Sequence, residues 1–394
     1  AQGSILAIAS ILVRVMGMIY RIPMTAIIGD KGNGFYSYAY SVYTILLLLS
    51  SYSLPLAVSK MVSAKAQLGQ WRNVKRVFIC AIAFAIGIGT TFGLIVLIGA
   101  QFFTRVFFHS ELAAIALRFM APTILIMALL GVFRGFFQGL QNTLPTAVSQ
   151  IVEGLINAIM SVVFAYFLFD FGHGMDAAGG TTDLGYAWGA AGGAIGTGAG
   201  ALAGLIFCFI LFVAYRKILA VNISRDKTGT QQEYGDIFRL MLSIALPVIL
   251  STALYNLIEL VDGSLFNNIM ASKGMEDVKD SMWGAYNAKA LLLVHIPVSI
   301  SSAMAVSLVP TLTAAYALGD EQTAKSKVHA ILRFISILAF PSAVGLLVLA
   351  NPIIKTLFSG DTSAASTYLQ VSAQPLSHSH FLLSQTRFFR ELTE

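Results

Sequence analysis

Two arginines lie seven residues apart in the first apolar stretch of this 394-residue chain, within LVRVMGMIYRIP (residues 12–23). Seven residues of helix turn through about 700°, so Arg14 and Arg21 share one face and lie roughly 10 Å apart along the axis. An arginine inside a membrane costs about 2.5–3.5 kcal/mol on insertion scales, so both are expected to face a wet interior. A guanidinium binds phosphate bidentately and keeps its charge, so the pair indicates a cationic cavity for an anionic substrate.

The same two residues have a structural interpretation. The side chain of Arg21 can extend to the outer membrane interface, and Arg14 can pair with an acid inside the membrane. Two lysines are further candidates for binding the substrate: Lys60 ends the second apolar stretch, and Lys289 lies early in the eighth. Lys60 is equally consistent with an anchor at the cytoplasmic surface, and Lys289 with a side chain that extends outward.

Three acidic residues also fall within apolar stretches. Glu153 lies in the fifth, and Glu259 and Asp262 lie in the seventh, where their spacing puts them on one helix face. They are candidates for a proton or cation site that couples transport, or for counter-charges to the basic residues. The second interpretation is favoured because a cationic cavity needs compensating charge when it is empty.

The composition places these charges in a membrane protein. Hydrophobic residues make up 57% of the chain, and charged residues make up 11%, against roughly 25% in soluble domains. Mean hydropathy is +0.77. Apolar runs of about 20 residues can cross a ~30 Å hydrocarbon core as helices, so we expect an all-α polytopic membrane protein. The nine expected spans are residues 4–28, 35–59, 77–103, 112–137, 145–169, 185–215, 237–269, 284–312 and 328–350.

Basic residues between these spans predict the orientation. Five fall on one side of the membrane: Lys31, Arg105, Lys273, Lys279 and Lys355. Fourteen fall on the other: Lys60, Lys65, Arg72, Lys75, Arg76, Arg134, Arg216, Lys217, Arg225, Lys227, Arg239, Lys325, Lys327 and Arg333. The positive-inside rule then puts the N-terminus in the cytoplasm. The loop after the fifth span, with Asp170, Asp176 and Asp183 and no basic residue, falls outside.

An internal repeat recurs at an offset of 250 residues. Gly34-Phe35-Tyr36 corresponds to Gly284-Ala285-Tyr286, and further matches are Leu68-Gly69 with Leu318-Gly319, Lys75 with Lys325, Phe108 with Phe358, and Glu111 with Asp361. The repeat keeps its direction across the membrane, which predicts two lobes related by an axis along the membrane normal. The expected domains are an N-terminal lobe of six spans (1–235), a truncated second lobe of three spans and the start of a fourth (236–370), and an atypical tail (371–394). His378 and His380 in that tail are interpreted as an incidental pair.

Other motifs indicate packing rather than chemistry. Glycines recur every four residues in the sixth span, which lets helix backbones approach closely; they are Gly185, Gly189 and Gly193, and Gly192, Gly196, Gly200 and Gly204. Cys80 and Cys208 lie in apolar runs and indicate neither a disulfide framework nor a metal cluster. We find no phosphate-binding loop, nucleophile elbow or metal quartet, so no enzyme activity, cofactor or metal is expected.

Several short motifs resemble the polysaccharide-biosynthesis branch of the multidrug/oligosaccharidyl-lipid/polysaccharide flippase superfamily, particularly its MurJ-like and SpoVB-like members. They are RGFFQGLQNTLPTAVSQIVE (134–153), RVMG (14–17) followed by YRIP (20–23), IGD (28–30), LAVSK (56–60) and SLVP (307–310). The resemblance covers about residues 4–365. It implies two lobes around a central cavity and a polyprenyl-pyrophosphate-linked sugar, such as lipid II, as substrate. It maps the cationic cavity onto Arg14 and Arg21, with Lys289 as the nearest match to a basic residue of the eighth span.

Two positions depart from that pattern: Asn157 stands where a basic residue is expected, and His295 where an asparagine is expected. The leading hypothesis is a flippase of the bacterial cytoplasmic membrane that moves a lipid-linked sugar by alternating access. Its expected partners are the lipid-linked oligosaccharide, membrane lipids and a candidate coupling cation, with no nucleic acid. One alternative is a cation-coupled multidrug exporter, which would have an acidic cavity. Another is a non-transporting interaction protein.

Overall fold

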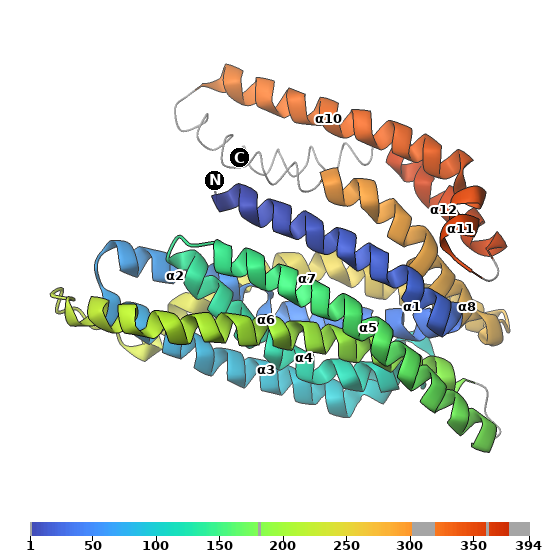
Figure 1. The fold of residues 1–394 in the computed structure, drawn as a ribbon, viewed down its shortest axis with the longest axis horizontal. Coiled ribbons are helices and arrows are strands. Elements are labelled where there is room, and N and C mark those ends of the chain that lie inside the picture. The colour runs from blue at the N-terminus through green and yellow to red at the C-terminus, as the bar shows by residue number, and fades with distance from the viewer. Residues whose placement is uncertain (1, 180–182, 302–319, 360–361, 378–394) are drawn as a thin grey trace.

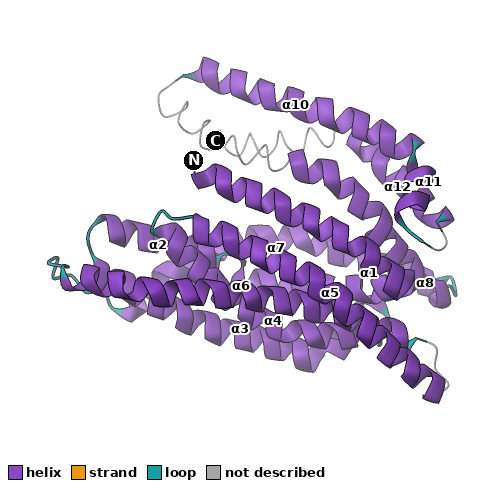
Figure 2. Cartoon of the chain, viewed as in Figure 1, coloured by secondary structure: helices purple, strands orange, loops and turns teal. Residues whose placement is uncertain are grey.

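The computed structural model describes residues 2–179, 183–301, 320–359 and 362–377, which form a bundle of long helices (Figures 1 and 2). The helices are α1 Gln2–Leu47, α2 Leu54–Gln67, α3 Trp71–Phe108, α4 Ala113–Gly139, α5 Leu144–Gly179, α6 Leu184–Ser224, α7 Tyr234–Ser272, α8 Glu276–Ala285, α10 Glu321–Val348, α11 Ala350–Leu357 and α12 Ser363–Ser377. Two π-helical segments, Leu48–Tyr52 and Tyr286–Leu291, lie between helices, and residues 292–301 are again helical.

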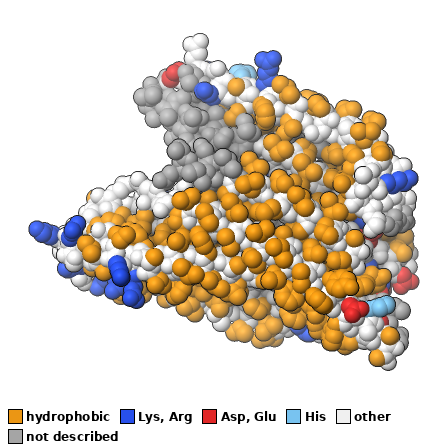
Figure 3. Space-filling model, viewed as in Figure 1, with side chains coloured by type: hydrophobic (Ala, Val, Ile, Leu, Met, Phe, Trp, Pro, Cys, Tyr) orange, Lys and Arg blue, Asp and Glu red, His pale blue; other side chains and the backbone are white. Residues whose placement is uncertain are grey.

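Length and apolar composition confirm a multi-pass helical membrane protein. Within the described residues, 6 helical stretches are long and apolar enough to cross a membrane: Ile11–Gln67, Trp71–Phe108, Ala113–Gly139, Leu144–Gly179, Leu184–Ser224 and Lys325–Val348. Hydrophobic side chains cover most of the visible surface between the ends of the bundle (Figure 3). Such a surface is suited to lipid, because water would leave it exposed at a high cost in free energy.

The longest stretch, α1 with α2, contains two predicted spans that meet at Gly29. Gly29 has φ 62° and ψ −175°, a conformation that glycine adopts readily because it has no Cβ. At this break the helix reverses direction, and the second half of α1 runs back beside the first half. The guanidinium of Arg21 therefore lies over the ring of Tyr36. The first predicted span, residues 4–28, therefore ends where the structure breaks the helix.

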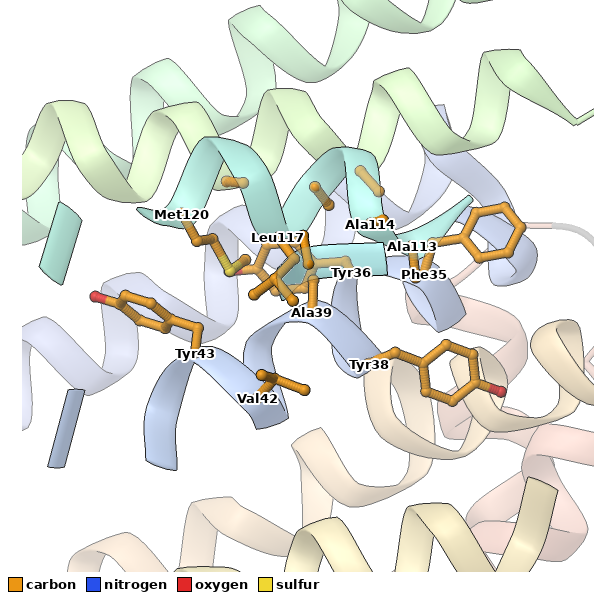
Figure 4. Packing of buried hydrophobic residues seen from close by; sticks show 14 of the residues in the cluster. Phe35, Tyr36, Tyr38, Ala39, Val42, Tyr43, Ala113, Ala114, Leu117 and Met120 are labelled. Atoms are coloured by element: carbon orange, nitrogen blue, oxygen red, sulfur yellow. The ribbon is translucent and has the colours of Figure 1, made fainter. Parts of the chain in front are cut away.

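The second half of α1 packs against α4 in the core of the first lobe (Figure 4). Tyr36 and Ala39 lie beside Leu117, and Met120 lies one turn further along α4. Tyr38 points the other way (Figure 4), and its hydroxyl donates to Asn267 Oδ1 of α7 at 2.9 Å. One helix thus links the first-lobe core to the second lobe.

The α6 glycines serve close packing, as predicted. Gly192 and Gly196 lie against α5 backbone at Phe164 and Ser161. In the other row, Gly193 packs against the Met24 side chain of α1. A methyl group at Gly192 or Gly196 would overlap the backbone of α5, so α6 can lie this close to α5 only with glycine there.

Helix boundaries confirm the 250-residue repeat. The first repeat has α3 over Trp71–Phe108 and α4 from Ala113; the second has α10 and α11 over Glu321–Leu357 and α12 from Ser363. The two copies meet reciprocally: Gly34 packs on the carbonyl oxygen of Asp280, and Gly284 packs on that of Asp30. Because 30 and 280, and 34 and 284, are equivalent positions, this is the contact expected beside a two-fold pseudo-axis.

Some predicted boundaries need correction. Arg134, which the sequence placed in a cytoplasmic loop, lies inside α4 and is buried, with 9% of its surface exposed. Asp170 and Asp176 belong to α5 rather than to the loop that follows it. The carboxylate of Asp176 accepts the N–H groups of Leu184 and Gly185 at the start of α6. The SLVP motif, Asp361 and the His378–His380 pair lie outside the described residues.

Candidate functional site

A cavity of about 470 Å³ lies between the two lobes. Its walls come from the two halves of α1, from α5 and α7, and from the helical segment 286–301. The lining residues are Val13, Arg14, Gly17, Met18, Tyr20, Arg21, Tyr36, Ser37, Tyr40, Gly154, Asn157, Glu259, Asn287, Leu291, Leu292, His295 and Ser299. Both lobes therefore contribute polar groups to one space.

The first-lobe wall carries both arginines, so the seven-residue spacing does place them on one face. Arg14 Nη1 donates to the backbone carbonyl of Ser299, across the cavity in the second lobe, at 3.2 Å. The guanidinium carbon of Arg21 lies 5.9 Å from the centre of the Tyr36 ring, a cation–π geometry. Neither arginine forms an ion pair within the part of the chain that the structure describes. The alternative in which Arg14 pairs with an intramembrane acid is thus not seen among these residues, and Arg21, for which extension to the outer interface was the alternative, lines the cavity instead.

Tyrosines surround Arg21, and the sequence analysis did not single them out. Tyr20, Tyr36 and Tyr40 all line the cavity, and the rings of Tyr36 and Tyr40 stack at 5.8 Å. The four-residue spacing of Tyr36 and Tyr40 was a signal, because it puts two aromatic side chains on one helix face. Only the return of α1 at Gly29 brings that face to Arg21.

The second-lobe wall carries one acid. Glu259 lines the cavity within electrostatic range of Arg21. Asp262 lies three residues after Glu259, but it is exposed and does not line the cavity. The predicted pair therefore contributes one carboxylate to the cavity. With both arginines and one carboxylate, the described lining carries a net charge of about +1 when His295 is neutral.

The two candidate lysines lie elsewhere. Lys60 is exposed near the middle of α2, as a surface anchor would be. Lys289 is buried, and its Nζ lies 2.8 Å from the Asp30 carboxylate, which joins the second lobe to the first. This placement corrects the expectation that Lys289 faces the cavity or extends outward. The Asp30 carboxylate compensates the charge of Lys289, next to the contact between Gly34 and Gly284.

The remaining predicted acid, Glu153, is a counter-charge inside the first lobe. Its Oε2 accepts Arg134 Nη2 at 2.7 Å, while Arg134 Nε donates to Ser149 Oγ at 2.8 Å. The sequence predicted that Glu153 has a basic partner, but it did not identify Arg134. The i, i+4 spacing of Ser149 and Glu153, which puts both on one face of α5, was the available signal.

Residues 1–315 match the family model described as polysaccharide biosynthesis protein, and residues 277–365 match a second model with the same description. The chain belongs to the polysaccharide biosynthesis protein family. The first match alone covers well over half of the chain and includes every residue of the cavity lining.

Two relatives of this polysaccharide biosynthesis protein come from Bacillus subtilis (strain 168). Lipid II flippase MurJ is 26% identical over 370 residues, covering 91% of this chain and 65% of the relative. Stage V sporulation protein B is 24% identical over 378 residues, covering 94% of this chain and 69% of the relative. The chain thus spans about two thirds of the length of these relatives.

A solved structure supports the fold of this family member. It is described as the inward-facing conformation of a multidrug resistance MATE family transporter of the MOP superfamily. The similarity has a TM-score of 0.70 with 14% identity, over 96% of this chain and 82% of that one. At this identity the similarity establishes the two-lobe architecture alone.

Proposed function

We propose that this chain is the flipping unit for a polyprenyl-pyrophosphate-linked sugar, such as lipid II or a polysaccharide repeat unit. One observation carries the proposal: two permanently charged arginines share one wall of a cavity that lies between two lobes. The name of the flippase relative supports the same substrate class. The proposed activity is transport of an intact molecule rather than enzymatic catalysis.

The cavity residues suggest how such a substrate binds. Each guanidinium presents a planar set of donors that matches phosphate oxygens, so Arg14 and Arg21 are proposed to hold one phosphate each. Asn157, Asn287 and Ser299 offer hydrogen bonds to the sugar. The lipid tail would stay in the bilayer while the lobes rock about the cavity and expose it to each side in turn.

Removing both arginines tests this proposal. We expect Arg14→Ala with Arg21→Ala to weaken binding of undecaprenyl pyrophosphate by at least tenfold, because each charge-assisted hydrogen bond contributes about 1.5–3 kcal/mol. Native mass spectrometry of the purified protein would measure the bound fraction. Arg216→Ala with Lys217→Ala, which removes two exposed cations outside the cavity, is the matched control. Equal binding by both double variants would reject a phosphate-binding role for the arginines.

A second function is favoured by Glu259. A carboxylate in the cavity is the group that a cation-coupled multidrug exporter would use, either for a cationic drug or for a coupling ion. Transport in proteoliposomes separates the two functions. An exporter would move a lipophilic cation in a manner that depends on a sodium or proton gradient and on Glu259. The flippase would move the pyrophosphate lipid and lose that activity with the arginines.

We further propose that the N-terminus and the α2–α3 and α6–α7 connections face the cytoplasm. Lys and Arg side chains gather at this end of the first lobe (Figure 3), as the positive-inside rule requires. Burial of Arg134 removes only one basic residue from that side. The reciprocal contact of Gly34 and Gly284 lies at the opposite end of the bundle, so the cavity is proposed to face inward in this structure.

Single cysteines test the orientation. Leu68→Cys lies in the exposed α2–α3 connection, and Met275→Cys lies in the exposed α7–α8 connection. We expect a membrane-impermeant maleimide to label the second in intact cells and the first only after the membrane is opened. The unsubstituted chain is the control, because Cys80 and Cys208 are both buried. The reverse labelling pattern would overturn the orientation.

A further inference from the structure

His295 lies in the cavity but has no role in the function proposed above. It is exposed to the cavity and lies within electrostatic range of both Arg14 and Arg21. One helical turn further along the same segment is Ser299, whose carbonyl oxygen accepts Arg14 Nη1. The imidazole therefore belongs to the wall that faces the two guanidinium groups.

The titratable groups around this imidazole come from two further elements. α1 presents Arg14 and Arg21 together with the phenols of Tyr20, Tyr36 and Tyr40, and α7 presents Glu259. Arginine keeps its charge throughout the physiological range, and a phenol is neutral there. Histidine is the side chain whose ordinary charge change falls between pH 5 and 8. Within the described lining, His295 is thus the group best suited to change the net charge near neutral pH.

Counting charges shows why such a change matters. With a neutral imidazole, the two arginines and Glu259 leave a net charge of about +1, whereas protonation of His295 brings it to about +2. A pyrophosphate diester, with a lipid on one phosphate and a sugar on the other, carries one negative charge on each phosphate. The +2 state matches the charge of this ligand, whereas the +1 state leaves one negative charge uncompensated, so the +2 state suits the ligand better.

We infer that His295 takes up a proton when a pyrophosphate diester binds, and then acts as a third cationic contact beside Arg14 and Arg21. This inference rests on the proposed function and adds to it a link between substrate binding and proton binding. Linkage is reciprocal, so a ligand that draws a proton onto the cavity must bind more tightly when protons are abundant. Substrate affinity should rise as pH falls from 8 to 6.

The test measures affinity against pH with a soluble probe, farnesyl-pyrophosphoryl-N-acetylglucosamine, a diester with two charges. We expect the full chain to bind it about tenfold more tightly at pH 6 than at pH 8. His295→Asn should bind with the affinity of the unsubstituted chain at pH 8, and that affinity should not change with pH. Asparagine is the residue that the family resemblance leads one to expect at this position. Calorimetry in two buffers of different ionisation enthalpy should show proton uptake only when His295 is present.

Three further variants distinguish a failure of the inference about His295 from a failure of the proposed phosphate site. His173→Asn removes an exposed imidazole outside the cavity and should keep the full pH dependence. If Glu259→Gln abolishes the pH dependence while His295→Asn retains it, the proton goes to the carboxylate, and our inference is wrong. Arg14→Ala with Arg21→Ala addresses the proposed function itself: unchanged probe binding at both pH values would reject the phosphate site, whatever His295 does. pH-independent binding by the unsubstituted chain, lost in that double variant, would reject the proton link alone.

Discussion

At the scale of single residues, the positive charges inside the bundle have two kinds of neighbour. Arg134 and Lys289 are buried and paired with carboxylates. Arg14 and Arg21 instead contact a carbonyl oxygen and an aromatic ring, which leave their positive charge uncompensated by direct contact. Because Arg14 is exposed to the cavity and Arg21 is half-buried, both guanidinium groups remain accessible to an incoming anion there.

The Arg134–Glu153 pair gives a prediction of stability. Glu153→Gln leaves a guanidinium inside the first lobe without its carboxylate, and we expect a loss of about 3 kcal/mol. Replacing both residues together, with Arg134→Met and Glu153→Leu, should recover most of that loss, because no uncompensated charge remains. The midpoint of thermal unfolding in detergent measures both. If the double variant is no more stable than Glu153→Gln, the pair does more than cancel charge.

At the scale of elements, the connection between α6 and α7 is fastened to the first turn of α3. The Asp226 carboxylate accepts the backbone N–H of Arg72 at 2.9 Å and the hydroxyl of Thr228 at 2.6 Å. The Asn73 side chain accepts the N–H of Gln232 at 3.0 Å. The first bond satisfies the N–H of Arg72, which α3 cannot use internally, and all three bonds hold the connection against the first lobe.

The contact between Asp226 and the start of α3 predicts that the stability of the protein decreases at acidic pH. The N–H of Arg72, helped by Thr228, lowers the pKa of Asp226 from 3.8 to about 2. Because the folded pKa lies below the unfolded one, the stabilisation is complete above about pH 4 and is lost as pH falls through about 2. The difference in unfolding midpoint between the unsubstituted chain and Asp226→Asn should therefore be constant above pH 4 and shrink below it. Glu233→Gln, in the same connection, should show no such trend.

At the scale of the whole molecule, the two lobes meet along α7 and at the contact between α1 and α8. The contact of α1 with α8 brings backbone against backbone at Gly34 and Gly284, next to the Lys289–Asp30 pair. The first half of α7 also packs on the first lobe, where Ile237, Met241 and Ala245 lie in one hydrophobic cluster with residues of α2, α3 and α4. The glycine contact is thus one of the contacts that set the relative position of the lobes.

A methyl group at this contact should move the lobes. In Gly34→Ala or Gly284→Ala the new Cβ would overlap a carbonyl oxygen of the other lobe, so we expect the lobes to separate there. Spin labels at Ala178→Cys and Met275→Cys would report a longer distance by pulsed paramagnetic resonance. Gly87→Ala is the control, because nothing lies within 4 Å of a Cβ at that position. Unchanged distances in both interface variants, with the protein still folded, would contradict this prediction.

Much of the fold could be predicted because the bilayer restricts the choices. Every backbone polar group inside a membrane must be satisfied, so long apolar runs become helices, and composition was sufficient to find them. The 250-residue repeat followed from short matches such as Gly34 and Gly284, which recur because the same close contact is made twice. Helix ends were less predictable: α5 continues past residue 169, because the energy of a helix end depends on local caps more than on hydropathy.

The candidate site, like the fold, could be predicted from the sequence only in part. The sequence by itself determined which charges are permanent and that Arg14 and Arg21 share a face, because helical periodicity is a local property. Only the tertiary structure decided that Lys289 pairs with Asp30, that Arg134 is buried with Glu153, and that Glu259 but not Asp262 lines the cavity. Those outcomes depend on which helix packs opposite each side chain, and in the case of Lys289 the partner Asp30 lies 259 positions away in the chain.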